Sequence, residues 1–223
     1  KYLVEEFVDG HEISIEAFIH KGKFYYYCFA VRDIESLSNG KIIEHGSISD
    51  PSYDDNKRND VEKVFERACF ALGIKEGPVK GDVLHTDSGP CLLEVASRSA
   101  PLAPLISERI YGVDMVSTHI KWVLDSNFKF EPLPVEFSES KPVSHRILFH
   151  EPGTIKGISG IDEAKKSKGV LKIIILKNLK FPMVLDYPDN SNRILYVAAT
   201  GSDATRARKN ADNALSKINL IYK

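Results

Sequence analysis

The sequence has 223 residues, 43% of them hydrophobic and 27% charged, which is enough for one large domain or two small ones with cores of their own. Lys and Arg number 30 and Asp and Glu 31, so the net charge of −1 argues against a general nucleic-acid binder, which would carry a basic excess. No apolar run is long enough to span a membrane and no signal peptide is visible, so we expect a soluble cytoplasmic protein with neither nucleic-acid nor membrane partners.

The cysteines indicate the redox compartment of the protein, and its first residues indicate whether the chain is a fragment. Cys28, Cys69 and Cys91 are odd in number, far apart and set in apolar stretches, which predicts buried free thiols in a reducing compartment. The chain opens without Met, inside an apolar pattern typical of a strand. We therefore expect a fragment, or a protein whose N-terminal portion is missing.

Alternating or aromatic-rich apolar patterns predict four strands near the start of the chain. They cover residues 2–8, 11–19, 23–31 and 42–48. A turn around Gly22 joins the second and third strands into a hairpin. Residues 34–41 are polar, contain Gly40 and predict a mobile loop.

A helix, a hairpin and two further helices follow in the middle of the chain. Val61, Phe65 and Leu72 share one face at helical spacing, and Gly73 is placed to end that helix. The hairpin strands and the two helices cover residues 79–84, 91–95, 105–111 and 113–125.

The last third of the chain predicts a small α+β domain. Several prolines and acidic residues at 127–142 are typical of a linker, which separates a first domain at 1–126 from a second at 143–223. The predicted strands are 143–150, 170–176 and 193–199, and the predicted helices are 161–166 and 203–218.

Each strand of the central hairpin carries one carboxylate in its interior, Asp82 in the first and Glu94 in the second. A charge inside an apolar strand is costly unless it is paired or bound to a cation. If the two strands pair, the carboxylates lie side by side, and their repulsion favours a divalent cation such as Mg2+, which prefers hard oxygen ligands. The alternative is a pair of acids that face solvent at an edge strand.

Two cations flank these acids. Lys80 and Arg98 form either a structural salt-bridge network or a clamp on a transferring phosphoryl or acyl-phosphate group. The acidic stretch 5–12 around Gly10 is likewise open to two interpretations, solvated strand ends or a nucleoside site.

Taken together, these segments closely resemble the ATP-grasp superfamily. The resemblance covers about residues 1–125. It rests on the hinge-like segment 4–14 (VEEFVDGHEIS), on the two metal-bearing strands at 77–82 (GPVKGD) and 92–98 (LLEVASR), and on the turn and helix at 111–116 (YGVDMV). Residues 143–223 resemble the small terminal domain of amino-acid-ligase-type members.

The resemblance implies an α+β fold, with an ATP-grasp C-terminal lobe of antiparallel sheet and helices followed by the small α+β domain. It also implies a carboxylate–amine ligase of the L-amino acid ligase type, which uses Mg-ATP and an acyl-phosphate intermediate to join small-molecule carboxylate and amine substrates. The missing N-terminal lobe would complete the ATP site, so we expect the fragment alone to be inactive. The oligomeric state is open, and a homodimer fits the sequence.

For the nucleotide, the resemblance implies that Glu5 lies near the adenine amino group, with the Glu6 carbonyl and the Val8 amide on the adenine edge. Glu12 would hold the ribose, and Arg32 would contact phosphate.

For the reaction, the resemblance implies that Asp82 and Glu94 bind Mg2+, that Lys80 faces the acyl phosphate and that Arg98 closes the second metal strand. Many members have Asn as a further metal ligand where this chain has Ala96, which puts the second metal in doubt. Two other functions stay open, a bicarbonate-using ATP-grasp carboxylase and a non-catalytic nucleotide-binding module.

Overall fold

The computed structural model of the chain describes all but a few segments. The described residues are 2, 4–36, 40–125, 127–130, 140–176, 183–185 (backbone only) and 192–223. They form two compact units, each continuous in space but not in sequence. The first unit consists of Lys1–Val31 and Ser52–Ser140, and the second of Arg32–Pro51 and Lys141–Lys223. The predicted boundaries at 126 and 142 stay a prediction.

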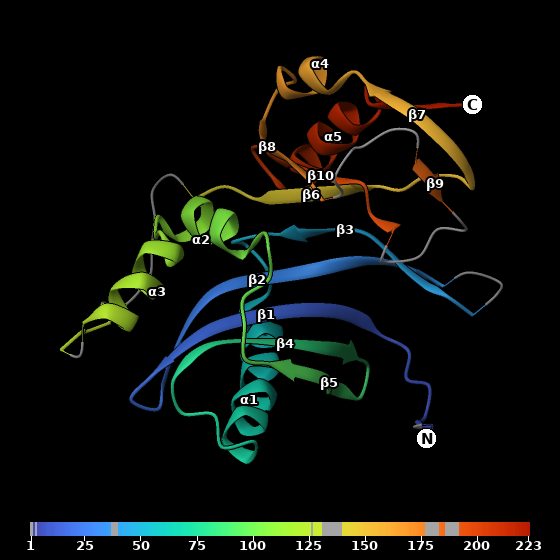
Figure 1. The fold of residues 1–223 in the computed structure, drawn as a ribbon. Helices are drawn as coiled ribbons and strands as arrows, with labels where there is room; N and C mark the ends of the chain where they lie inside the picture. The colour runs from blue at the N-terminus through green and yellow to red at the C-terminus, as the bar shows by residue number, and fades with distance from the viewer. Residues whose placement is uncertain are drawn as a thin grey trace. The chain divides into compact units, whose positions relative to one another are not determined.

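The sheet of the first unit is antiparallel, with its strands in the order β5-β4-β1-β2 (Figure 1). The bounds are β1 His11–His20, β2 Lys23–Ser36, β4 Gly77–Thr86 and β5 Gly89–Ala96. Helix α1, Asp55–Ala71, lies against one face of this sheet, and its N-terminus is capped by the Asp54 carboxylate, which accepts from two backbone N–H groups.

Along β1 and β4, every second side chain points toward α1, and these side chains form the core between the sheet and the helix. The fully buried or nearly buried members of this core come from the sheet and from α1. They are Ile13, Ile15, Ala17, Ile19, Phe29, Val61, Phe65, Cys69, Val79 and Val83. The same alternation turns the intervening side chains of β1 and β4 to the other face of the sheet, where the polar residues lie.

Two helices follow β5 in the first unit, α2 at Ala103–Tyr111 and α3 at Met115–Leu124. Gly112, in the left-handed conformation at φ 69°, ends α2, and the Asp114 carboxylate caps α3 by accepting from the N–H groups of the next turn. The inner side of α3 packs on the sheet through edge contacts of His119 and Trp122 with Phe18.

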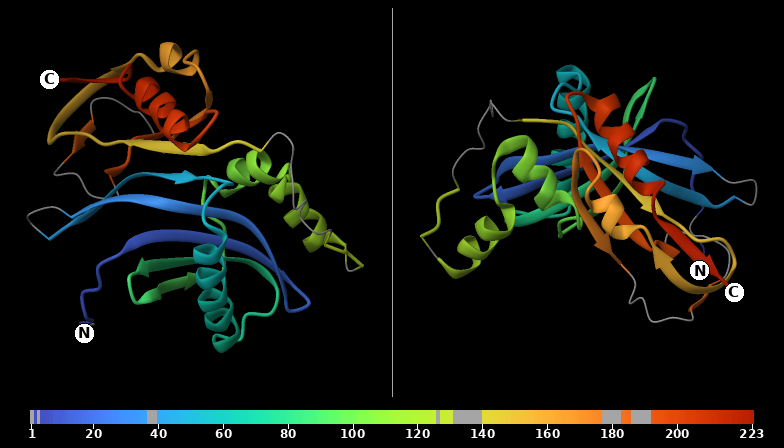
Figure 2. Two further views of the ribbon diagram at one scale, coloured as in Figure 1. Left: turned by 180° about the vertical axis from the view of Figure 1, so that it is seen from behind. Right: turned by 90° about the horizontal axis from the view of Figure 1, so that it is seen from above.

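The second unit holds an antiparallel sheet in the order β3-β6-β10-β8, and α5 covers one face of β6 and β10 (Figure 2). A smaller sheet has the order β11-β7-β9. The elements are β3 Ile42–Ser49, β6 Val143–Leu148, β7 Gly153–Ser159, α4 Ile161–Lys165, β8 Val170–Ile175, β9 Met183–Leu185, β10 Leu195–Thr200, α5 Ala204–Leu215 and β11 Asn219–Tyr222.

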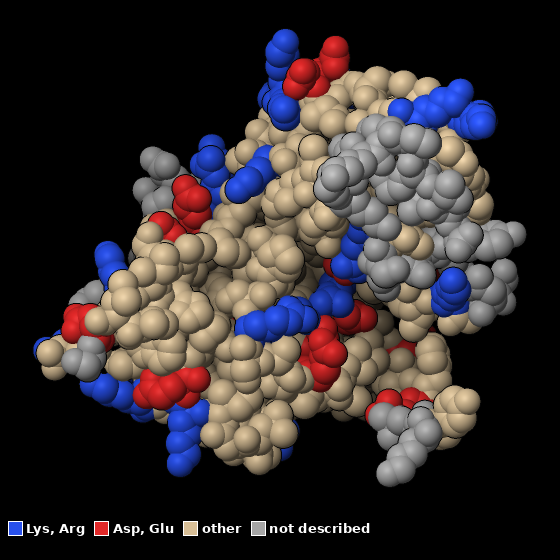
Figure 3. Space-filling view, viewed as in Figure 1, with Lys and Arg blue, Asp and Glu red and all other residues tan. Residues whose placement is uncertain are grey.

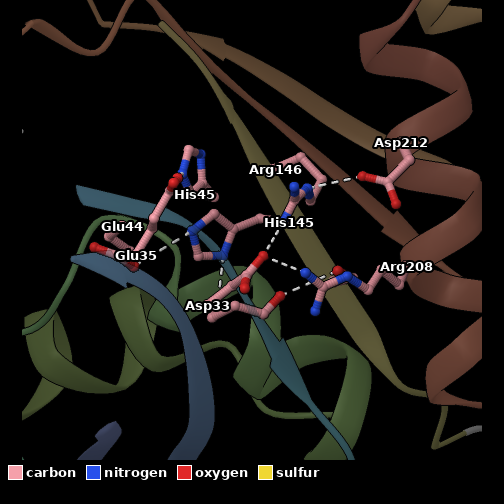
Figure 4. Close-up of polar contacts among 10 residues, drawn as sticks. Asp33, Glu35, Glu44, His45, His145, Arg146, Arg208 and Asp212 are labelled. Carbon is pink, nitrogen blue, oxygen red and sulfur yellow. Dashed lines mark hydrogen bonds and ion pairs between the residues drawn. The ribbon is translucent and has the colours of Figure 1, made fainter. Parts of the chain in front are cut away.

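Ionic contacts tie the early segment 32–51 to the C-terminal part of the second unit. Asp33 accepts hydrogen bonds from both Arg146 on β6 and Arg208 on α5, and Arg146 Nε also lies 2.8 Å from Asp212 Oδ1 (Figure 4). Burial raises the pKa of Asp33, but the two arginines outweigh this effect and hold it below its usual value. The Asp33 carboxylate, shared by two arginines, therefore holds the end of β2 against β6 and α5 of the second unit.

A second group of polar contacts lies deeper in the same unit. His145 on β6 shares a hydrogen bond of 2.9 Å with the Ser47 hydroxyl, and Glu44 accepts from Arg193 at 2.8 Å. Burial, reinforced by the nearby arginine charges, lowers the pKa of His145 to about 3, so this imidazole is neutral at physiological pH.

The α+β class is confirmed, with an antiparallel sheet and few helices, but two local predictions are wrong. Residues 2 and 4–9 form no strand: Tyr2, Val4 and Phe7 are 80–100% exposed, so their apolar pattern has no packed layer to bury it. Ile34 to Ser36 continue β2 and are no loop, while 37–39 lie outside the described residues. The prediction also missed β7, β9 and β11.

On the face shown in Figure 3, basic and acidic side chains are interspersed, as a net charge of −1 predicts. Within the described residues, no helix is both long and apolar enough to cross a membrane. None of the three cysteines, all of which the structure describes, is in a disulfide; Cys28 and Cys69 are buried and Cys91 is half-buried.

Candidate functional site

The candidate site lies on the face of the first unit's sheet that points away from α1. In the register of β1 and β4, Ser14 is opposite Asp82 and Glu16 is opposite Lys80. In the register of β4 and β5, Asp82 is opposite Glu94. Because directly opposed residues of antiparallel strands share a face, these polar side chains gather on one surface. The predicted pairing of the two carboxylates is confirmed.

Lys80 lies between the two carboxylates. Its Nζ contacts Asp82 Oδ2 and is 3.7 Å from Glu94 Oε1. The side chains of Lys80 and Asp82 are only 5% and 8% exposed, whereas that of Glu94 is 58% exposed. A buried ammonium is tolerated because a carboxylate compensates its charge, and the exposed partner leaves the cluster open to solvent on one side.

A local irregularity sets the direction of Glu94. The register shifts between Asp82, which pairs with Glu94, and Val83, which pairs with Leu92, so Leu93 is an extra residue on β5. Such a β-bulge bends the strand and re-aims neighbouring side chains, and bulges are frequent beside active sites. Leu93 itself is 51% exposed, so about half of its side chain is open to solvent.

A buried acid that the sequence analysis did not single out lies on the same face. Glu16 is 1% exposed, and its Oε2 accepts from the Tyr27 hydroxyl at 3.2 Å and from the Ala100 N–H at 3.0 Å. Burial raises the pKa of Glu16 from 4.5 to about 7, against those hydrogen bonds and the charges of Lys80 and Arg98. The signal was present in the alternation of Ile13, Ile15 and Ala17, which places Glu16 on the face opposite the core.

The other predicted site residues lie at the margins of this surface or away from it. Glu5 and Glu6 are exposed in the irregular segment before β1, Val8 is half-buried there, and Glu12 is half-buried near the start of β1. Arg32, next along β2 after Val31, belongs to the second unit.

The end of β5 carries the remaining candidates. Arg98 is exposed two residues beyond the end of the strand, and its guanidinium makes neither a hydrogen bond nor an ion pair with any residue that the structure describes. Ala96, at the position of the doubtful further metal ligand, is opposite Lys80 and offers no side-chain oxygen.

The donor set suits one hard cation. Asp82 and Glu94 offer carboxylate oxygens on facing positions, and Mg2+ needs only one or two protein carboxylates when phosphate oxygens complete its shell. Among the described residues, no group of three or more His, Cys, Asp or Glu side chains is arranged to hold a metal.

The first unit is thus an antiparallel sheet backed by one helix, with facing acids and a lysine on its open face. In the second unit, residues 146–223 match the family model of the L-amino acid ligase C-terminal domain 2. The chain has the fold of the ATP-grasp ligases, and the match to the L-amino acid ligase model covers its C-terminal part.

Two solved structures are similar in fold to this chain over nearly its whole length. The L-amino acid ligase from Bacillus licheniformis superposes with a TM-score of 0.80 at 20% identity and covers 97% of this chain and 53% of its own. The phosphoribosylglycinamide synthetase from Anaerococcus prevotii gives a TM-score of 0.76 at 18% identity, with 98% and 55% covered.

Among curated sequences, the uncharacterized protein y4rH of Sinorhizobium fredii is 28% identical over 167 residues, which is 71% of this chain and 34% of that protein. The chain thus spans about half the length of the matched structures and about a third of this relative.

Proposed function

We propose that this chain is the catalytic C-terminal part of an ATP-dependent carboxylate–amine ligase that works through an acyl phosphate. One observation carries the proposal: Lys80, Asp82 and Glu94 meet on the open face of a sheet, and Arg98 lies two residues beyond the end of β5, the strand that carries Glu94. Opposite charges of this kind, held by rigid strands, suit a phosphoryl group in transfer.

Asp82 and Glu94 are the residues that would hold Mg2+ against the ATP phosphates. When bound, the ion would neutralise the charge that develops on the transferring phosphoryl group. Lys80, which contacts Asp82 here, would hold a phosphate or acyl-phosphate oxygen in place of that carboxylate.

The protein's own groups supply position and charge, and no covalent intermediate on the protein is needed. A substrate carboxylate oxygen attacks the γ-phosphorus, and the bond to the β-bridging oxygen breaks to release ADP. The amine then attacks the acyl carbon, and phosphate leaves with the former carboxylate oxygen. Lys80 and Arg98 are the two cations that would hold the anionic oxygens in both steps.

The nucleotide assignments belong to the same proposal. Glu5, Glu6 and Val8 would face adenine and Glu12 the ribose, with Arg32 on phosphate. The exposure of Glu5 and Glu6 and the half-burial of Glu12 leave these groups accessible to a ligand. An N-terminal lobe of the same protein, of the kind that would occupy the other half of the matched structures, would cover this face and complete the ATP site.

The test is ADP release by the complete natural protein with Mg-ATP, across a panel of amino acids offered singly and in pairs. Release that depends on one carboxylate together with one amine supports the ligase. Release that needs bicarbonate and no amine would point to a carboxylase instead, and ATP binding without any release would point to a non-catalytic module.

A further inference from the structure

We propose that Glu16 is a positioning residue: it anchors the Arg98–Ala100 turn and thereby holds Arg98 in place for the reaction. This inference rests on the proposed function. It does not place Glu16 on the substrate, because the side chain is 1% exposed and its contacts are all internal.

The anchor is built from three segments that are far apart in the sequence. Glu16 lies on β1, Tyr27 on β2, and Ser99 and Ala100 beyond the end of β5. The Tyr27 hydroxyl lies 3.2 Å from Glu16 Oε2 and 2.7 Å from Ser99 Oγ, and the Ala100 N–H donates to the same Oε2 at 3.0 Å. Two consecutive residues of the turn are therefore tied to the sheet, one through a side chain and one through the backbone.

Arg98 is the residue that this tether controls. It directly precedes Ser99, is exposed, and makes neither a hydrogen bond nor an ion pair of its own within the described residues. Its backbone is therefore fixed on one side by β5, which ends at Ala96, and on the other by the contacts of Ser99 and Ala100. Without the second attachment, the next fixed point of the chain after Arg98 would be the start of α2 at Ala103.

Burying the Glu16 carboxyl group costs free energy, which also argues that the residue has a specific role. A carboxylate in the sheet interior needs its lone pairs satisfied, yet Oε1 is buried without a hydrogen-bond partner among the described residues. Packing alone would be served better by an apolar side chain of similar size. What an apolar side chain cannot supply is an acceptor for both Tyr27 and Ala100.

The direct test is hydrogen exchange at the Ala100 amide. In Glu16→Ala we expect exchange of this amide to be at least about tenfold faster, because its acceptor is gone, and tryptic cleavage after Arg98 to become faster. Glu16→Gln is the conservative rescue: both present hydrogen bonds go to a single oxygen, which the amide carbonyl can replace, so protection should be kept. Unchanged exchange in Glu16→Ala would overturn the anchor.

A matched control is available on the other face of the same sheet. The Tyr26 hydroxyl donates to Glu66 on α1 at 2.9 Å, a pair of the same chemistry with no link to the end of β5. Glu66→Ala should leave the Ala100 amide protected. Faster exchange there as well would show general loosening of the sheet and would count against a specific anchor.

Kinetics of the complete natural protein decide whether the anchor serves the reaction. We expect Glu16→Ala to lower kcat by about 10–100-fold with little change in the KM for ATP, since misplacement of a group by about 1 Å costs on this scale. In the Arg98→Ala background, Glu16→Ala should lower kcat by less than about twofold, because the guanidinium that Glu16 helps to position is already absent.

Three kinetic results would overturn the positioning role: unchanged kcat in Glu16→Ala, an additive effect in the double variant, or a loss in Glu16→Gln equal to that in Glu16→Ala. If the unaltered protein makes no product at all, the proposed function fails and with it the catalytic use of the anchor. The exchange experiment would still decide the anchor itself.

Discussion

Gly81 separates Lys80 from Asp82, and we predict that its replacement by Ala damages both stability and activity. A Cβ at this position would lie 2.4 Å from Phe65 Cδ2 and 2.6 Å from Cε2, against about 3.4–4 Å for an ordinary contact. Phe65 is fully buried in the core under α1, so its ring cannot swing into solvent. Glycine is thus required here for close approach of β4 to α1.

The magnitude follows from that overlap. Relief needs a shift of about 1 Å between β4 and α1, and overpacking of this kind typically costs about 1–3 kcal/mol. Because Lys80 and Asp82 flank the displaced residue, a shift of about 1 Å should also lower kcat by up to about a hundredfold.

Chemical unfolding monitored by circular dichroism would measure the loss of stability. Gly157→Ala on β7 is the matched control, because among the described residues its Cβ would meet only Ile221 Cδ1, at an ordinary 3.6 Å. Shortening the buried ring should restore part of the loss, so Phe65→Leu in the Gly81→Ala background should be more stable than expected from the two single changes. A Gly81→Ala protein as stable as the Gly157→Ala control would refute the close-approach argument.

Three more predictions follow from the site and from the second unit. Asp82→Asn or Glu94→Gln should lower ligation by at least about a hundredfold, and ligation at wild-type rate in either variant would remove the metal assignment. The pKa of Glu16 is about 7 in the folded protein and 4.5 in the unfolded chain, so between these pH values the unfolded chain loses this proton first. The unfolding free energy of the wild type should therefore fall by about 3 kcal/mol relative to that of Glu16→Gln as pH rises from 4.5 to 7. Urea titrations at several pH values can check this. Asp33→Asn should lower the unfolding free energy by about 1–3 kcal/mol at pH 7, because it leaves two arginines without their shared anion. The folded pKa of Asp33 is depressed, so its contribution is present above the unfolded pKa and is lost in acid, and equal effects of Asp33→Asn at pH 7 and pH 2 would contradict this account.

Local patterns predicted what depends on neighbours in the sequence. The alternation of apolar residues gave β1 and the core face, and the turn between β4 and β5 was enough to predict that these strands pair. The bulge at Leu93, which the pattern did not predict, is what places Asp82 opposite Glu94. Helix α1 followed from helical spacing and from a glycine at its end. In each case, the residues that form the pattern and the residues that they contact lie close together in the sequence.

What the sequence could not supply depends on distant segments. The link between Glu16, Tyr27 and Ser99 joins residues 11 to 83 positions apart, and no local pattern encodes it. The segment 4–9 has the apolar content of a strand, but a strand needs a partner for its backbone groups, and none of the described residues pairs with it. Likewise, β2 extends to Ser36, into the predicted loop, because the Asp33 contacts with Arg146 and Arg208 hold its end in the second unit.

The central claim, ligation through an acyl phosphate, is tested most directly by following the carboxylate oxygens. The complete natural protein would be given Mg-ATP, its amine and a carboxylate substrate labelled with oxygen-18, and the released phosphate and the amide would be examined by mass spectrometry. The account predicts that one labelled oxygen from each turnover appears in inorganic phosphate, with the other retained in the amide. Label in AMP, or amide formation with no label in phosphate, would contradict it.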